Sequence, residues 1–193
     1  DERPIVVVSA MSKVTDMLYR IADMAAAQDE AQTSLLLEQL RERHITVASE
    51  LLANSGHMLN EAISEINNIC DYLEKVVTSV CALGELSARS KAIIISRGEI
   101  LSSTIIYHAM NASGIDTELI DARQMIITNG DTLVGDPIFD EINSRVPGII
   151  EKGYKGMKAV ITQGFISSTI DGEPSVLGRG GSDYTASLIG MAV

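Results

Sequence analysis

The feature that most constrains the fold is a long stretch of helical sequence between regions that favour β-strands. From Thr33 to about Ala88 the chain contains no proline and few residues that favour strands. Asn54-Ser55-Gly56 and Gly84 interrupt this stretch. Apolar residues recur in it at the three- and four-residue spacing of a helix face: Leu35, Leu36, Leu40, Ile63, Ile66, Cys70, Leu73 and Val77. We therefore predict two or three long helices whose charged residues face solvent.

The segments on either side of this stretch favour parallel strands. Ile5-Val6-Val7-Val8 is a β-branched run typical of a strand that is buried on both faces. A small polar loop from Ser9 to Asp16 follows it, and then a helical pattern from Met17 to about Ala31. Thr117 to Asp121 and Ala159 to Thr162 favour two further strands. Strands that alternate with helices predict an α/β fold with a mainly parallel sheet.

Turn-forming residues predict where the second half of the chain is interrupted. Arg97-Gly98-Glu99 separates an apolar segment from a helix over Ile100 to Met110. Gly135-Asp136-Pro137 and Pro147-Gly148 indicate two loops. Tyr184 to Val193 favours a final helix.

Length and charge exclude several classes of protein. A chain of 193 residues fits one domain with a substantial core. Its net charge of −11, from 26 acidic and 15 basic residues, disfavours nucleic-acid binding because such a surface repels phosphate backbones. No window approaches the ~18–20 apolar residues of a membrane span, and the N-terminus shows no charged-then-apolar leader. We expect no membrane partner and a cytoplasmic location.

The cysteines and histidines do not follow the patterns of metal sites or nucleophiles. Cys70 and Cys81 lie in the helical stretch, and we interpret them as buried small hydrophobes in a reducing cytoplasm. His44, His57 and His108 lie in helical sequence without a nucleophile pattern nearby, so we assign them structural roles. We predict no metal site built from these side chains.

Three segments of small residues are the candidates for a ligand site. Ser9 to Thr15, Arg97-Gly98-Glu99 and Gly178 to Asp183 lie at strand ends or helix starts. Open α/β sheets bind their ligands at these places. Glu99, beside a glycine and ahead of an apolar helix, either complements the helix dipole or holds an ammonium group.

The glycine-rich segment before the last helix indicates an anion site. Gly178, Gly180 and Gly181 let the backbone approach a ligand closely, and a helix N-terminus attracts anions. Arg179 offers a planar fork for a carboxylate or phosphate, and Ser182 offers a hydroxyl. The spacing is not the dinucleotide fingerprint, and the lysine of a P-loop is absent. The alternative is a glycine-rich turn in which Ser182 or Asp183 is the N-cap of the following helix.

Four motifs, in the order in which they occur, resemble those of aspartate kinases. They are Val6 to Asp16, Ser96 to Ser102, Ile161 to Ile166 and Leu177 to Ala186, and the last is the most specific. The helical region from about 17 to 90 resembles the insertion of the long type. That type includes lysine-sensitive aspartate kinases and the kinase half of bifunctional aspartokinase–homoserine dehydrogenases.

The resemblance implies an amino-acid-kinase fold, a three-layer α/β/α sandwich with a mainly parallel central sheet and a helical insertion. It implies transfer of a phosphoryl group from ATP, bound as its Mg²⁺ complex, to the β-carboxylate of L-aspartate. This is the first step in the biosynthesis of lysine, threonine and methionine. The family also implies a homodimer.

Site residues follow from the resemblance by position. Glu99 would bind the substrate α-ammonium and Arg179 its α-carboxylate, while Thr15, Phe165 and Ser182 would line the same pocket.

The phosphoryl side of the site is implied in the same way. Asp183 would organise the catalytic centre, and Ser9 with the amides of Gly180 and Gly181 would lie near the transferred group. A carboxylate nucleophile with a reference pKa near ~4 is already ionised at neutral pH, so no general base is needed. This agrees with loops that offer glycines, hydroxyls and one arginine.

The chain departs from the family pattern in one motif. The Lys-Phe-Gly-Gly loop with which the family begins is absent from the 193 residues. We expect residues 1–193 to be a catalytic domain that is incomplete at both ends and does not turn over alone. Three alternatives stay open: a related kinase acting on glutamate, N-acetylglutamate, carbamate or UMP; a truncated module that binds without catalysis; and a dinucleotide-binding oxidoreductase.

Overall fold

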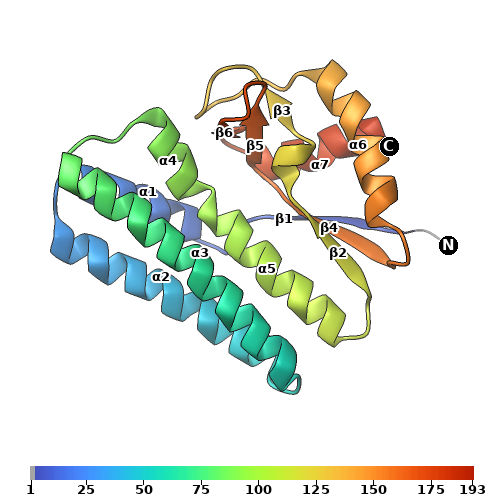
Figure 1. Cartoon of the computed structure of the whole chain (residues 1–193), viewed down its shortest axis with the longest axis horizontal. Helices are drawn as coiled ribbons and strands as arrows, with labels where there is room; N and C mark the ends of the chain where they lie inside the picture. The colour runs from blue at the N-terminus through green and yellow to red at the C-terminus, as the bar shows by residue number, and fades with distance from the viewer. Residues whose placement is uncertain (1–2) are drawn as a thin grey trace.

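Three parallel strands form the central sheet (Figure 1). The computed structural model describes residues 3–193, and its central strands lie in the order β1 (Ile5–Val8), β4 (Ala159–Gln163) and β2 (Thr117–Ile120). Val8 pairs with Gln163, and Ile120 pairs with Thr162. The carboxyl ends of the three strands therefore meet at one edge of the sheet. The sequence predicted these strands to within one residue, and they are confirmed.

A second sheet continues from the ends of β4 and β2. Its strands are β3 (Ile127–Thr128), β5 (Ile166–Thr169) and β6 (Pro174–Val176). β3 runs parallel to β5, and β5 forms an antiparallel hairpin with β6. Serine and threonine dominate β5, so the apolar run that indicates a buried strand is missing. The sequence analysis did not predict these three strands.

Helices cover both faces of the central sheet. On one side lie α1 (Val14–Ala26), α2 (Glu30–Leu51), α3 (Gly56–Leu83), α4 (Ala88–Ile95) and α5 (Arg97–Ala112). Of these, α5 packs most broadly on the strands, and the others pack around it. On the other side lie α6 (Phe139–Gly153) and α7 (Gly181–Ala192), which contact β2 and β1. The predicted three-layer α/β/α sandwich is confirmed.

The helical stretch forms long helices, as predicted. α2 and α3 are separated close to Asn54-Ser55-Gly56, and α3 ends at Gly84, whose φ of 65° is a left-handed conformation that glycine favours. The limits predicted for the first helix, Met17 to Ala31, are wrong. The chain turns at Gln28, with a φ of 59°, and Asp29 then caps α2 by accepting a hydrogen bond from a backbone N–H.

Two segments predicted as loops are helical. Arg97-Gly98-Glu99 forms the first turn of α5, and Pro147-Gly148 lies inside α6. Proline lacks the N–H that an interior helix position donates. In α6, however, Ile142, Val146 and Ile150 recur every four residues and are all buried. This apolar face outweighs the local cost of the proline.

The cysteines are free and buried, as predicted. Burial raises the pKa of the Cys70 thiol to about 11. Of the histidines, His44 and His108 are buried, whereas His57 is exposed. Within residues 3–193, no helix is long and apolar enough to cross a membrane.

Candidate active site

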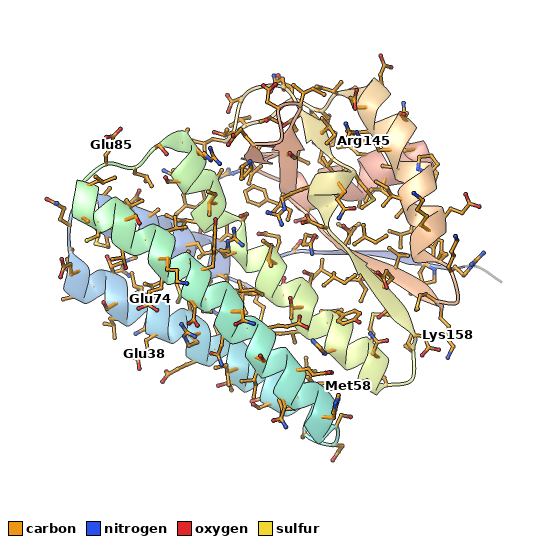
Figure 2. All side chains as sticks on the ribbon, viewed as in Figure 1. Glu38, Met58, Glu74, Glu85, Arg145 and Lys158 are labelled. Carbon is orange, nitrogen blue, oxygen red and sulfur yellow. The ribbon has the colours of Figure 1, made fainter. Side chains whose placement is uncertain are left out.

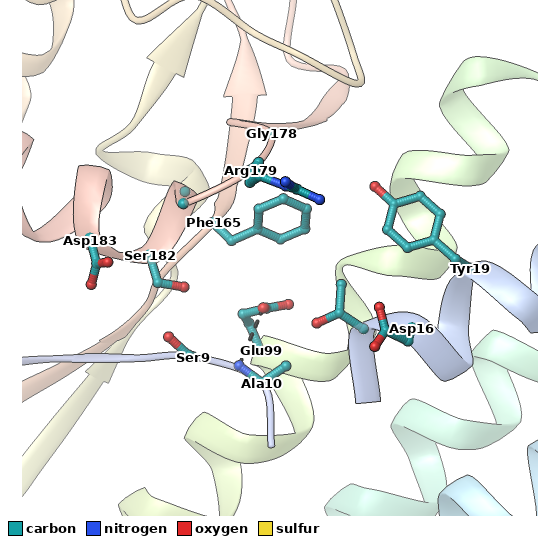
Figure 3. A pocket seen from close by; sticks show the side chains of 13 residues that line it. Ser9, Ala10, Asp16, Tyr19, Glu99, Phe165, Gly178, Arg179, Ser182 and Asp183 are labelled. Atoms are coloured by element: carbon teal, nitrogen blue, oxygen red, sulfur yellow. Dashed lines mark hydrogen bonds between the residues drawn. The ribbon is translucent and has the colours of Figure 1, made fainter. Parts of the chain in front are cut away.

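A pocket of about 530 Å³ opens where the ends of the central strands meet the starts of three helices, α1, α5 and α7. All nine site residues implied by the sequence line it: Ser9, Thr15, Glu99, Phe165, Arg179, Gly180, Gly181, Ser182 and Asp183. Four further residues also line it: Ala10 and Gly178, which lie in the candidate segments, and Asp16 and Tyr19, which the sequence analysis did not assign to the site. Figure 3 shows the side chains of Arg179, Glu99 and Tyr19 on different sides of this space.

Each wall of the pocket comes from a different part of the chain. The loop after β1 supplies Ser9 and Ala10, and the turn after β4 supplies Phe165. Because β1 and β4 are paired neighbours, these two loops lie side by side. The start of α5 supplies Glu99, and the segment from β6 into α7 supplies Gly178 to Asp183.

Glu99 is the buried charge of the pocket, with only 3% of its surface exposed. Its Oε1 accepts a hydrogen bond of 3.2 Å from the Ala10 N–H. Its Oε2 has no hydrogen-bond partner among the described residues. Burial raises the pKa of Glu99 to about 7, although backbone hydrogen bonds oppose this shift. A buried carboxylate oxygen without a donor is costly, so this site favours a ligand that brings a donor.

Close packing holds the start of α5 against the loop after β1. A side-chain carbon at Gly98 would lie 2.8 Å from Cβ of Ala10 and 3.2 Å from Cγ1 of Val14. The hydroxyl of Ser102 donates a 2.7 Å hydrogen bond to the carbonyl of Ser9. Only glycine allows this approach, and the approach places the Glu99 carboxylate beside the Ala10 amide.

Gln163, the last residue of β4, links β4 to α5 and to the short 3₁₀ helix after β2 through hydrogen bonds. Its Nε2 donates a 3.0 Å hydrogen bond to Oγ of Ser103 on α5. Its Oε1 accepts a 2.9 Å hydrogen bond from the N–H of Ala122, which begins the short 3₁₀ helix after β2. All three groups are buried. The sequence analysis placed Gln163 in a motif but gave it no role.

The Phe165 backbone is held in a left-handed conformation, with a φ of 66°. Its N–H donates a 3.1 Å hydrogen bond to Oγ1 of Thr185, and that hydroxyl donates to the carbonyl of Gly181. A side-chain carbon at Gly181 would lie 2.8 Å from the Phe165 ring, and one at Gly164 would lie 2.6 Å from Ser182. A strained, closely packed non-glycine residue of this kind is typical of functional sites.

The glycine-rich segment presents backbone N–H groups to the pocket. Gly178 and Gly180 have φ values of 77° and 74°, and Gly180 is the residue that precedes α7. The alternative of a cap by Ser182 or Asp183 is wrong, because both lie inside the first turn and no side chain caps the helix. The N–H of Gly181 donates a 3.1 Å hydrogen bond to the carbonyl of Gly178, so the amide expected near the transferred group is already bonded. The N–H groups of Ser182 and Asp183, in the same first turn, have no partner among the described residues and remain available to an anion.

The charges that line the pocket are mostly negative. Asp16, Glu99 and Asp183 contribute carboxylates, and Arg179 contributes the guanidinium. Arg179 is exposed and forms no ion pair with any residue from 3 to 193. Its planar fork is therefore free to bind a carboxylate or phosphate.

Asp16 and Tyr19 could have been found from the sequence. They lie in the first turns of α1 at a spacing of three, which places both side chains on one helix face. Because the predicted helix began at Met17, Asp16 was assigned to a loop and Tyr19 to a helix without a role in the site. A start at Val14 would have placed both residues beside Thr15.

The comparisons with known proteins decide the family. The sequence profile described as the amino acid kinase family matches residues 1–193. The chain belongs to the amino acid kinase family.

Curated relatives of this family member are aspartokinases. The chain is 32% identical over 196 residues to bifunctional aspartokinase/homoserine dehydrogenase 1, chloroplastic, of Zea mays, covering 100% of this chain and 20% of that protein. It is 34% identical over 191 residues to the aspartokinase of Chlamydia trachomatis, covering 98% of this chain and 40% of that protein. The chain thus spans a fifth to two fifths of the length of these relatives. The resemblance to aspartate kinases is confirmed.

Solved structures share the fold. Escherichia coli aspartokinase III in complex with lysine and aspartate matches with a TM-score of 0.86 at 23% identity, covering 97% of this chain and 40% of that one. The same enzyme in complex with aspartate and ADP matches with a TM-score of 0.84, also at 23% identity, over 98% of this chain and 40% of that one.

The close contact between α7 and Phe165 predicts that Gly181→Ala disrupts the pocket. The added carbon meets the ring at 2.8 Å and the Phe165 Cα at 3.0 Å. We expect a loss of about 1–3 kcal/mol in the free energy of unfolding, as is typical of overpacked sites, measured by chemical denaturation. The matched control is Gly190→Ala in the same helix, where nothing lies within 4 Å. The control should stabilise the protein by up to ~1 kcal/mol; equal effects of both changes would contradict the described packing.

The burial of Glu99 predicts how stability depends on pH. Its pKa rises from an ordinary value of 4.5 to about 7 on folding, so the folded state keeps this proton where the unfolded state has lost it. Glu99→Gln should therefore gain stability relative to the native protein as pH rises through this range. The gain should reach about 3 kcal/mol.

Denaturation curves at a series of pH values measure this difference. Glu50→Gln, at an exposed position of α2, controls for the loss of a carboxylate. A difference between Glu99→Gln and the native protein that stays constant from pH 4.5 to pH 7 would contradict the buried, uncompensated carboxylate.

Proposed function

We propose that the protein carrying this chain is an aspartate kinase. It transfers the γ-phosphoryl group of ATP to the β-carboxylate of L-aspartate, which gives 4-phospho-L-aspartate for the biosynthesis of lysine, threonine and methionine. Curated relatives over the whole chain are named aspartokinases, and a structure with the same fold was solved with aspartate and ADP. The observation that carries the proposal is the free Oε2 of buried Glu99 in the same pocket as Arg179.

The two charged groups suit the two ends of an α-amino acid. The α-ammonium brings the donors that Oε2 of Glu99 lacks, and its positive charge favours the ionised carboxylate. The α-carboxylate matches the planar fork of Arg179. Phe165 and Thr15, which line the same pocket, complete the walls around the substrate.

The remaining lining residues suit a phosphoryl group. The β-carboxylate of aspartate is an ionised nucleophile at neutral pH, so the chain needs to align it and to stabilise negative charge. The N–H groups of Gly180, Ser182 and Asp183, the hydroxyls of Ser9 and Ser182, and the positive end of α7 suit that task. The N–H of Gly181 does not take part, because it donates to the carbonyl of Gly178.

The metal of the reaction would arrive with the nucleotide. No group of three His, Cys, Asp or Glu side chains suited to a metal occurs within residues 3–193. Mg²⁺ takes phosphate oxygens and water as ligands and needs only one or two carboxylates from a protein. Asp183 at the start of α7 fits that role. When bound, the metal supplies positive charge that offsets the charge of the phosphates.

We propose that catalysis requires the complete protein. Residues 1–193 form part of its catalytic domain, with the region from about 17 to 90 as an insertion. The absence of a Lys-Phe-Gly-Gly motif from these residues supports this assignment, as does the share of the relatives' length that the chain spans. We further propose that the complete protein is cytoplasmic, forms a homodimer and has no nucleic-acid partner.

Arg179→Ala tests the assignment of the amino-acid subsite. In the complete protein, we expect this change to raise the KM for aspartate by the equivalent of about 2–5 kcal/mol of lost binding, with little change in the KM for ATP. Steady-state kinetics with aspartate and with a panel of glutamate, N-acetylglutamate, carbamate and UMP measures this effect. Equal rises in both KM values would contradict the role of Arg179. Preference for another acceptor would contradict the proposed reaction.

A further inference from the structure

Tyr19 occupies a wall of the pocket that the proposed function leaves without a role. It lies on α1, in the helical layer, and 36% of its surface remains exposed. Figure 3 shows its hydroxyl pointing across the pocket, towards the side on which Arg179 lies. The hydroxyl forms no hydrogen bond with any described residue.

Lys91 fixes the orientation of the Tyr19 ring from outside the pocket. Its Nζ lies 5.2 Å from the ring centroid, in a cation–π contact, and 3.9 Å from Oδ1 of Asp23. Lys91 belongs to α4, whereas Tyr19 and Asp23 belong to α1. The contact therefore ties two helices of the layer together at the point where the layer meets the pocket.

The negative charge of the pocket favours a further hydrogen-bond donor to the substrate. Asp16 and Asp183 add negative charge that disfavours the carboxylates of an amino dicarboxylate, and Arg179 is the lone cationic side chain among the residues that line the described pocket. A neutral hydroxyl that donates to the substrate carboxylate adds affinity without adding charge. Tyr19 lies on the opposite wall from Arg179, so the two could hold one carboxylate from both sides.

We propose that Tyr19 is a substrate-binding residue that sets affinity for the amino acid. Its hydroxyl donates to the carboxylate that Arg179 binds, and Lys91 is a positioning residue that holds the ring. The inference rests on the proposed function, because the ligand is the α-amino dicarboxylate of that reaction. It gives α1 a second residue, besides Thr15, in substrate recognition.

Tyr19→Phe in the complete protein tests this proposal. The change removes the hydroxyl and keeps the ring on which Lys91 packs. Hydrogen bonds to charged groups are strong, so the loss of this one should raise the KM for aspartate about tenfold or more. The KM for ATP and the thermal midpoint should change little, because the ring stays in place.

Tyr72→Phe is the matched control. Tyr72 is also partly exposed on a helix of the same layer, and its ring also lies beneath a cation, 4.7 Å from Cζ of Arg97. It does not line the pocket. Its substitution should leave both KM values at the native level.

A double substitution tests the role of Lys91. Lys91→Met alone should raise the KM for aspartate a few-fold, because the ring loses its cation. In the Tyr19→Phe background it should add nothing, because the hydroxyl that it positions is gone. Full additivity of the two changes would overturn the positioning role.

The outcomes separate this inference from the proposed function. A native protein that does not phosphorylate aspartate would overturn the proposed function itself. An active native protein whose KM for aspartate is unchanged by Tyr19→Phe would overturn the inference alone. Equal rises in the KM for aspartate and for ATP, with a lower thermal midpoint, would assign Tyr19 a structural role and would also overturn it.

Discussion

Glu99 lies buried at the start of α5, with one carboxylate oxygen bonded to the Ala10 amide and the other without a donor. Much of the site follows from that placement. Gly98 has no side chain because α5 must approach Ala10 and Val14 closely, and Ser102 bonds the loop after β1 for the same reason. An ammonium group is a ligand that would compensate both the charge and the missing donors.

The opposite wall is built by close contact as well. Phe165 is held with a positive φ, and Gly164 and Gly181 leave room for Ser182 and for the Phe165 ring. These contacts fix the start of α7, where the N–H groups of Ser182 and Asp183 have no hydrogen-bond partner among the described residues. The central sheet places β4 beside β1, so the loops that begin the two walls leave neighbouring strands. The site is therefore organised before any ligand binds, which limits the entropy cost of binding.

The sequence predicted the layers, and the nine residues that it implied for the site line one pocket, because these features depend on local patterns and specific motifs. It did not predict β5 or β6, whose serine-rich strands are buried through hydroxyl hydrogen bonds such as that between Ser167 and Ser175. Pro147 was read as a loop because the buried face of α6 is a tertiary property. Tyr19 was missed because the helix was predicted to begin at Met17, so the helix face that Tyr19 shares with Asp16 was not recognised.

Calorimetric titration with L-aspartate, in two buffers of different ionisation enthalpy, tests the central claim most directly. The Glu99 carboxyl has a pKa of about 7 in the empty pocket, so ammonium binding below that pH must expel its proton. We predict release of nearly one proton per aspartate at about pH 6 and almost none at about pH 8. Glu99→Gln should release none at either pH. Binding of aspartate without proton release at pH 6, or equal release by native protein and Glu99→Gln, would contradict the account.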